Sequence, residues 1–495
     1  MNLKLIRNIA FWSFLGLYLV VAPAISLHAL GYVIDPKTFR LVKTGIISIS
    51  TEPERANVWV NEKLQRDTTS FAVTGLLPNV YQVKVAMEGY QPVEMELSVA
   101  AEEVTKIEHL LLIPEQLNYV APVSASTYYL SHPNQSRLIF LFSRSDRAIT
   151  IYSFDLRKKK LSLLLELNNS SIGELRGLQV VLSDDEKKAF FMLRDSLNVS
   201  QWLVNLSGEA DALDLSKLIP ELFSNLRFHP KNSRELFYLS DDFLNLFDIE
   251  SRTRKKIFQG KVRSFEAIDD RLFILTDDFR LLSSTLQGKE IKDLLPERGL
   301  YRLLFEENAR HAYQMFLTAQ ESAFWLREDG VLITNRLPHF IDDNVKGAQL
   351  VEGSEKLLYW KSNELWIIDM EVLVERERAF FEKGPKKTLL FTSKRPIISA
   401  QAIRGGNQVV LASDDELVLV QSDPHLLGKT FLLAKHRMKK RISFFTDEPS
   451  GDLYWIDQAE NEMPYLRKAR LFEESMFPFS IRLKKAFQSP NEVSL

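Results

Sequence analysis

The first thirty residues differ from the rest of the chain because they show no alternation of apolar and polar positions. No charged residue occurs between Asn8 and Ile34, and large apolar side chains dominate the run from Ile9 to Leu30. A helix that rises 1.5 Å per residue needs roughly 20 residues to cross a hydrocarbon core. The pattern therefore predicts a short cytoplasmic tail and a transmembrane anchor over residues 1–34. Pro23 is expected to kink this helix or to end it early.

A cleaved signal peptide is the alternative interpretation of this segment. Lys4 and Arg7 would be its basic start, and residues 22–24 would be the cleavage site. Since the apolar run is longer than a usual signal core of about 7–15 residues, we favour an uncleaved, single-pass anchor in the cytoplasmic membrane. We expect the amino terminus inside and the bulk of the chain extracytoplasmic; the inverted topology, with a cytoplasmic carboxy-terminal portion, is the alternative.

After a linker at residues 35–44, the pattern changes to strict alternation. Apolar residues occupy every second position around Ile47, Val58, Val83 and Met95. A period of two is typical of strands with one buried face. Turn-forming residues separate these segments, for example at residues 61–63. Residues 45–113 are therefore expected to form a compact antiparallel β-sandwich.

This segment also resembles the PEGA domain, a small β module of bacterial and archaeal surface proteins. The naming motif of that family stands here as Pro53-Glu54-Arg55-Ala56, and a later Pro-Gly turn stands as Pro78-Asn79. Arg55 replaces the usual glycine, which predicts that this turn does not need a positive φ. The resemblance implies placement outside the membrane and a packing or binding role, with no catalytic residues.

The remaining residues, 114–495, repeat one unit: an apolar strand, a polar turn and a second apolar strand. Eight such hairpins start 34–52 residues apart, at residues 138, 189, 235, 271, 311, 356, 408 and 442. Strand pairs recurring about every 40–50 residues are typical of β-propeller blades. The segment from Phe228 to Asp242 resembles the repeats of WD40-like and TolB-like propellers.

The predicted fold class is therefore mainly β: an amino-terminal transmembrane helix, a PEGA-like sandwich, and a propeller of seven or eight blades. A ring is favoured because each sheet needs a neighbour to cover its faces and because closure removes exposed edges. Helices after most strands, which an α/β enzyme would require, are not found. Residues 371–383 are expected to form a helical insertion between strands.

Composition excludes several classes of function. The chain of 495 residues has no cysteine, which removes disulfides, thiol nucleophiles and iron–sulfur ligation. Lys and Arg number 63 against 65 Asp and Glu, a net charge of −2. A nucleic-acid partner is not expected, since such proteins need a basic face to displace phosphate counterions.

Candidate chemistry is sparse. Acidic pairs occur at residues 184–185, 241–242, 277–278, 342–343 and 414–415, and most fall at expected hairpin turns, where Asp caps backbone amides. Eight histidines are scattered without metal-binding spacing. Walker, Rossmann and nucleophile-elbow motifs are missing. We therefore expect no catalytic, cofactor-binding or metal-binding residues and no cofactor.

These patterns predict a non-enzymatic scaffold or recognition protein of the cell envelope. The propeller would bind a protein or a cell-wall polymer, and the amino-terminal helix would contact the lipid bilayer. The alternative is an envelope hydrolase or lyase whose active site lies in the mouth of the propeller, with carboxylates from separate blades. Clustered Asp, Glu, His or Tyr on the inner strands would favour this alternative.

Overall fold

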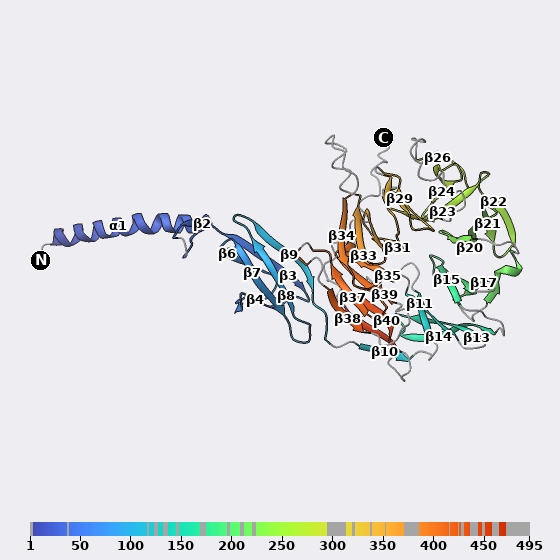
Figure 1. Cartoon of the computed structure of the whole chain (residues 1–495), viewed down its shortest axis with the longest axis horizontal. Helices are drawn as coiled ribbons and strands as arrows, with labels where there is room; N and C mark the ends of the chain where they lie inside the picture. Colours follow the sequence, from blue (N-terminus) through green and yellow to red (C-terminus); the bar gives the residue numbers. More distant parts are fainter. Residues whose placement is uncertain are drawn as a thin grey trace, which may run out of the picture. The chain divides into compact units, whose positions relative to one another are not determined.

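The structure is a computed structural model of the whole chain, and two compact units hold the described residues (Figure 1). The first is essentially residues 1–117 and the second residues 118–448 with 453–468. The structure describes residues 3–36, 39–115, 118–122, 127–131, 137–144, 148–168, 175–195, 199–207, 212–219, 224–294, 313–318, 322–336, 339–351, 353–370, 386–414, 416–423, 425–426, 430–435, 444–447, 451–457 and 465–471.

The amino-terminal segment forms one helix, α1 (Leu3–Ala29), and Pro23 lies inside it without ending it. Two short antiparallel strands follow, β1 (Tyr32–Ile34) and β2 (Leu41–Lys43), so the expected linker contains β2. Among the described residues, no helix combines the length and the apolar character needed to cross a membrane. The predicted transmembrane anchor over residues 1–34 is therefore not supported.

The next strands form a sandwich of two sheets. One sheet has the order β5-β4-β7-β8 and the other β6-β3-β9. The strands are β3 (Gly45–Glu52), β4 (Asn57–Val60), β5 (Lys63–Leu64), β6 (Phe71–Leu76), β7 (Asn79–Ala86), β8 (Val93–Val99) and β9 (Val104–Leu111). Alternate residues such as Ile47, Val58, Val85 and Leu97 are fully buried between the sheets. The expected sandwich is present, with one difference: β9, which follows β8 of the other sheet, pairs with β3 in parallel.

Arg55 contradicts the expectation for its turn. Its φ is 70°, in the left-handed region, and its N–H donates to the carbonyl oxygen of Thr69 at 2.8 Å. This backbone hydrogen bond stabilises the left-handed conformation, which is unfavourable for a residue with a Cβ atom. Asn79 stands where the PEGA family has the glycine of its Pro-Gly turn. It is the first residue of β7 and does not have a positive φ.

The second unit is a ring of eight four-stranded antiparallel sheets in the described residues. From the first to the fourth sheet, the strands are β11 (Thr127–Ser131), β12 (Leu138–Arg144), β13 (Ala148–Asp155), β14 (Lys160–Asn168); β15 (Leu175–Leu182), β16 (Lys188–Asp195), β17 (Val199–Asn205), β18 (Ala212–Asp214); β19 (Ser224–His229), β20 (Asn232–Ser240), β21 (Phe243–Asp248), β22 (Thr253–Lys256); β23 (Val262–Ile268), β24 (Arg271–Thr276), β25 (Leu281–Thr285) and β26 (Lys292–Asp293).

The fifth to eighth sheets follow the same plan. Their strands are β27 (Tyr313–Leu317), β28 (Ala323–Arg327), β29 (Leu332–Thr334), β30 (Phe340–Asp342); β31 (Gly347–Leu350), β32 (Lys356–Trp360), β33 (Glu364–Asp369), β34 (Lys386–Thr392); β35 (Ser399–Ile403), β36 (Gln408–Ala412), β37 (Glu416–Gln421), β38 (Thr430–Lys435); β39 (Phe444–Asp447), β40 (Asp452–Asp457), β41 (Tyr465–Arg470) and β10 (Asn118–Pro122). Short 3₁₀ turns occur at Leu215–Lys217 and Arg404–Gly406.

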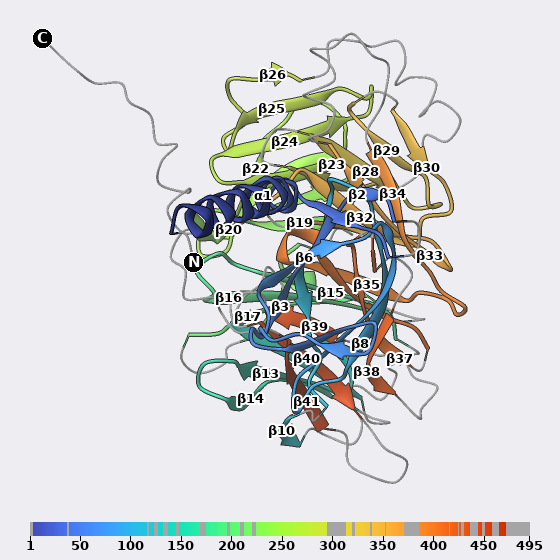
Figure 2. The ribbon, with the colours of Figure 1, turned by 90° about the vertical axis from the view of Figure 1, so that its left-hand side faces the viewer.

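The last sheet closes the ring, because it combines strands from both ends of the unit. β10 precedes the first complete blade in the chain, yet it pairs with β41 and forms the outer edge of the eighth sheet. In Figure 2 the sheets succeed one another in sequence order, from teal through green and yellow to red, and β10 lies beside β41. First strands of neighbouring sheets contact one another, including β39 with β11. The predicted propeller is thus confirmed, and the described residues form eight blades.

The apolar core lies between the blades. Each described cluster in this unit combines two neighbouring sheets: Phe140 of the first blade packs edge-on against Phe191 of the second at 5.2 Å between ring centroids. Phe237 and Phe265 pack similarly across the third and fourth blades.

Six of the eight predicted hairpins form the central strands of a blade. The hairpins that start at residues 311 and 442 fall on the first two strands of their blades. The predicted helical insertion at residues 371–383 lies outside the described residues.

We predict that Arg55→Gly raises the free energy of unfolding of the sandwich by about 0.5–1 kcal/mol. Glycine removes a left-handed penalty of about 1–2 kcal/mol, partly offset by its greater freedom in the unfolded chain. Urea unfolding followed by hydrogen exchange of the amides of β3 and β7, which report on the sandwich, would measure the change. Glu54→Gly, at a neighbouring exposed residue without positive φ, should destabilise instead. A loss of stability in Arg55→Gly would contradict the prediction.

Candidate functional site

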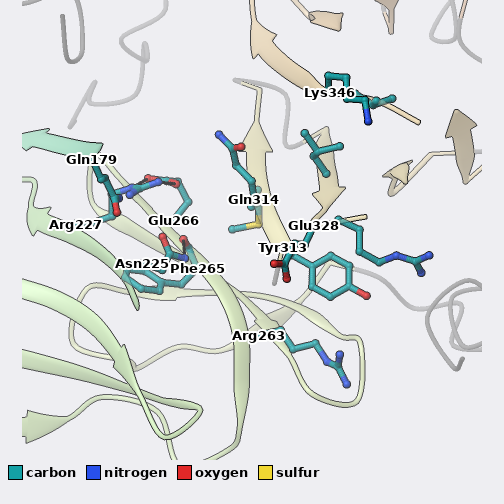
Figure 3. A pocket seen from close by; sticks show the side chains of 14 residues that line it. Gln179, Asn225, Arg227, Arg263, Phe265, Glu266, Tyr313, Gln314, Glu328 and Lys346 are labelled. Carbon is teal, nitrogen blue, oxygen red and sulfur yellow. Dashed lines mark hydrogen bonds and ion pairs between the residues drawn. The ribbon is translucent and has the colours of Figure 1, made fainter. Parts of the chain in front are cut away.

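A cavity of about 530 Å³ lies along the first strands of several blades. β15, β19, β23 and β27 all contribute residues to it, and Figure 3 shows the polar side chains that meet there. Its volume falls within the range of roughly 300–1,000 Å³ that is usual for ligand sites. The lining residues are Gln179, Asn225, Arg227, Arg263, Phe265, Glu266, Tyr313, Gln314, Met315, Leu326, Arg327, Glu328, Val345 and Lys346.

Strand alternation explains why a charged residue of β19 reaches this cavity. Leu226 and Phe228 are buried in the core between the second and third blades. Arg227 stands between them in the strand, so its side chain points to the opposite face, toward the fourth blade. There it meets Glu266 of β23.

Arg227 and Glu266 form a bidentate ion pair between two blades. Nε of Arg227 donates to Oε1 of Glu266 at 2.7 Å, and Nη2 donates to Oε2 at 3.0 Å. Only 29% of the arginine side chain and 18% of the glutamate side chain are exposed. Although burial acts to lower it, the pKa of the Arg227 guanidinium is raised by the charge and hydrogen bonds of Glu266. Glu266 is therefore held in place by both donor nitrogens of one partner.

Two further arginines stand near Tyr313 at another edge of the cavity. Arg263 is 8% exposed in its side chain, pairs with Asp277 at 2.9 Å, and lies over the ring of Phe279 at 4.2 Å. Arg327 donates two hydrogen bonds of 2.7 Å to the carboxylate of Asp329. Burial raises the pKa of the Tyr313 hydroxyl, which keeps it neutral over the physiological range.

The cavity is thus suited to binding polar and charged groups. Its lining holds four cations and two carboxylates, with three side-chain amides and no histidine. One carboxylate, Glu266, is engaged by Arg227, so the lining offers one other acid, the exposed Glu328. This arrangement favours a binding role over the paired acid and base that glycoside cleavage requires.

The acidic pairs have two different roles. Residues 184–185, 241–242 and 277–278 lie in turns, as predicted. Asp185 accepts from the hydroxyl of Ser183, and Asp278 accepts from Thr276 at 2.5 Å, so these aspartates organise their turns. Asp185 also accepts from Ser233 of β20, in the next blade. Asp415 lies outside the described residues. Groups of three or more potential metal ligands are absent from the part of the chain that the structure describes.

Asp342 departs from the turn interpretation, because it is buried at the end of β30. Its carboxylate pairs with Lys361 at 2.6 Å and with Lys387, and it accepts from the hydroxyl of Tyr359 at 2.9 Å. Burial acts to raise the pKa of Asp342, but hydrogen bonds from the two lysines and the tyrosine hold it below its usual value. Since β30 belongs to the fifth blade and its partners to the sixth, the cluster ties two blades together.

Sequence reasoning identified none of the cavity arginines. The available signal was a single arginine inside an otherwise apolar first strand, as in Leu226-Arg227-Phe228 and Val262-Arg263. A charge at such a position is rarely buried without a partner. The partners could not be recognised, because Arg227 and Glu266 are 39 positions apart.

One comparison with known proteins concerns the first unit. Residues 44–112 match the family model of the PEGA domain, which confirms the predicted resemblance. No curated protein matches the chain.

Two of the solved structures that match the chain are the following. One is the β-propeller domain of Cps50 (Swd1) from Myceliophteria thermophila, 11% identical, which covers 72% of this chain and 99% of its own with a TM-score of 0.41. The other is the computationally designed Ika8 protein, 13% identical, which covers 71% and 98% with a TM-score of 0.40.

We predict that Arg227→Gln lowers the free energy of unfolding by about 2–4 kcal/mol, because it leaves Glu266 without its cation in a largely buried site. The double variant R227Q/E266Q should recover part of this loss. Urea unfolding would measure both. Arg234→Gln is the matched control, since its ion pair with Glu250 is about 60% exposed on each side and should contribute at most about 1 kcal/mol. Equal losses in the two single variants would contradict the prediction.

We also predict that Asp342 makes stability depend on pH. Because its folded pKa lies below the unfolded value, its contribution is present above about pH 4 and is lost as the pH falls through the folded pKa. Asp342→Asn should lower the free energy of unfolding by about 2–3 kcal/mol at pH 7, and the gap to the parent should narrow on acidification. Unfolding curves from pH 7 to pH 3 would show this. Asp343→Asn, at a 60% exposed side chain, should leave the profile unchanged.

Proposed function

We propose that the protein is a scaffold or recognition protein of the cell envelope, on the outer side of the cytoplasmic membrane. Its propeller would bind a protein or a cell-wall polymer without catalysing a reaction. The observation that carries this proposal is the cavity along the first strands, where polar side chains from several blades meet and Glu266 is held by Arg227. A PEGA domain and a propeller together support an interaction role.

Contact with lipid is the second part of this proposal. α1 exposes large apolar side chains, among them Phe14 at 75% and Val20 at 71%. Contiguous exposed apolar surface of this kind is typical of a surface that another molecule or a bilayer covers. We assign this role to the lipid of the cytoplasmic membrane.

Crosslinking followed by mass spectrometry in native membranes tests partner and location together. We expect crosslinks from propeller loops to an envelope protein or a wall fragment, and cleavage of those loops by protease added to intact spheroplasts. A chain lacking residues 3–29 should leave the membrane fraction. Protection of the propeller until the membrane is permeabilised would overturn the location. Turnover of a glycan or peptide by the purified chain would favour the hydrolase or lyase.

A further inference from the structure

The cationic side chains of the cavity differ in whether they already form an ion pair with a carboxylate of the protein. Arg227 is committed to Glu266 through both donor nitrogens of a bidentate pair. Lys346 is exposed, and the ion pairs among the described residues do not include it. Its charge is therefore available to a ligand that enters the cavity.

Arg263 offers a second donor. Its side chain is 8% exposed and one of its terminal nitrogens pairs with Asp277, but its Nε donates to none of the described residues although the atom is buried. A buried donor without an acceptor costs about 1–3 kcal/mol, which an incoming acceptor would recover. In Figure 3, Lys346 and Arg263 stand at opposite edges of the cavity.

The surface between these two edges is suited to a peptide. The side-chain amides of Gln179, Asn225 and Gln314 each carry a donor and an acceptor, as a peptide backbone does. Met315 and Val345 add apolar wall that can cover aliphatic parts of side chains. A polysaccharide would be better served by exposed aromatic faces, whereas Phe265 and Tyr313 are buried.

We infer that the cavity binds a short acidic peptide segment of a partner protein, with its carboxylates at Lys346 and at Arg263. This inference rests on the proposed function and narrows its partner to a protein with an accessible acidic stretch. The volume of about 530 Å³ fits a few residues of an extended chain and excludes a folded domain.

Fluorescence anisotropy with the purified full-length chain tests the inference. The probes are a fluorescein-labelled decapeptide of alternating glutamate and glycine, its glutamine counterpart, and a labelled oligogalacturonate as an anionic polysaccharide. We expect the glutamate peptide to bind at least tenfold more tightly than the glutamine peptide, and its affinity to fall with added salt.

Variants locate the binding within the molecule. Lys346→Gln should weaken binding of the glutamate peptide by about tenfold, since it removes one charge-assisted contact. Gln314→Glu should weaken it as well by placing a like charge in the path of the peptide. Lys289→Gln removes an exposed lysine outside the cavity and should leave the affinity unchanged. Circular dichroism would show that each variant is folded.

Three results would overturn the inference: equal affinity for both peptides, equal effects of Lys346→Gln and Lys289→Gln, or binding of the oligogalacturonate alone. The last result would assign the cavity to a polysaccharide. If crosslinking identifies an envelope partner and its binding is unchanged in Lys346→Gln and Gln314→Glu, this inference is wrong, whereas the proposed function is not contradicted.

Discussion

The propeller depends on one constraint: every four-stranded sheet has two apolar faces, and each face must be covered by the next sheet. Burial of apolar surface contributes roughly 25 cal/mol per Å², and the shared cores contain many fully buried aromatic side chains, such as Phe140, Phe191 and Phe237. A linear stack would leave two terminal faces in water. Closing the stack into a ring covers them, and the pairing of β10 with β41 provides the strand that completes the last sheet.

Polar bonds between neighbouring first strands supplement this apolar packing. The amide of Asn225 donates to the carbonyl of Phe265 at 3.4 Å, and Gln401 accepts from the N–H of Thr446 at 2.9 Å. Gln349 accepts in the same way from the N–H of Ala402 at 3.2 Å. These bonds join the first strands of neighbouring blades, and the two residues of one of them, Asn225 and Phe265, also line the cavity.

Most of the fold could be predicted from the local alternation of apolar and polar residues. Hairpins were recognisable because consecutive residues alternate or form apolar runs between turn residues, and this signal requires no knowledge of distant partners. Relations over long distances were not recognisable: the parallel pairing of β3 with β9, the closing strand β10, and the pair of Arg227 with Glu266. Asp342 shows the same limit, since its neighbour Asp343 suggested a turn while its actual partners are Tyr359, Lys361 and Lys387. The positive φ of Arg55 could not be predicted, because the carbonyl oxygen that accepts from its N–H belongs to Thr69, which is distant in the sequence.

The closing pair of strands has a consequence for biosynthesis. β10 emerges from the ribosome directly after the sandwich, but its hydrogen-bonding partner, β41, is made some 350 residues later. Until translation reaches that point, the nascent chain carries an unsatisfied strand next to an already complete small domain. Closure of the ring therefore cannot precede the synthesis of β41, and it requires the two ends of one long segment to pair.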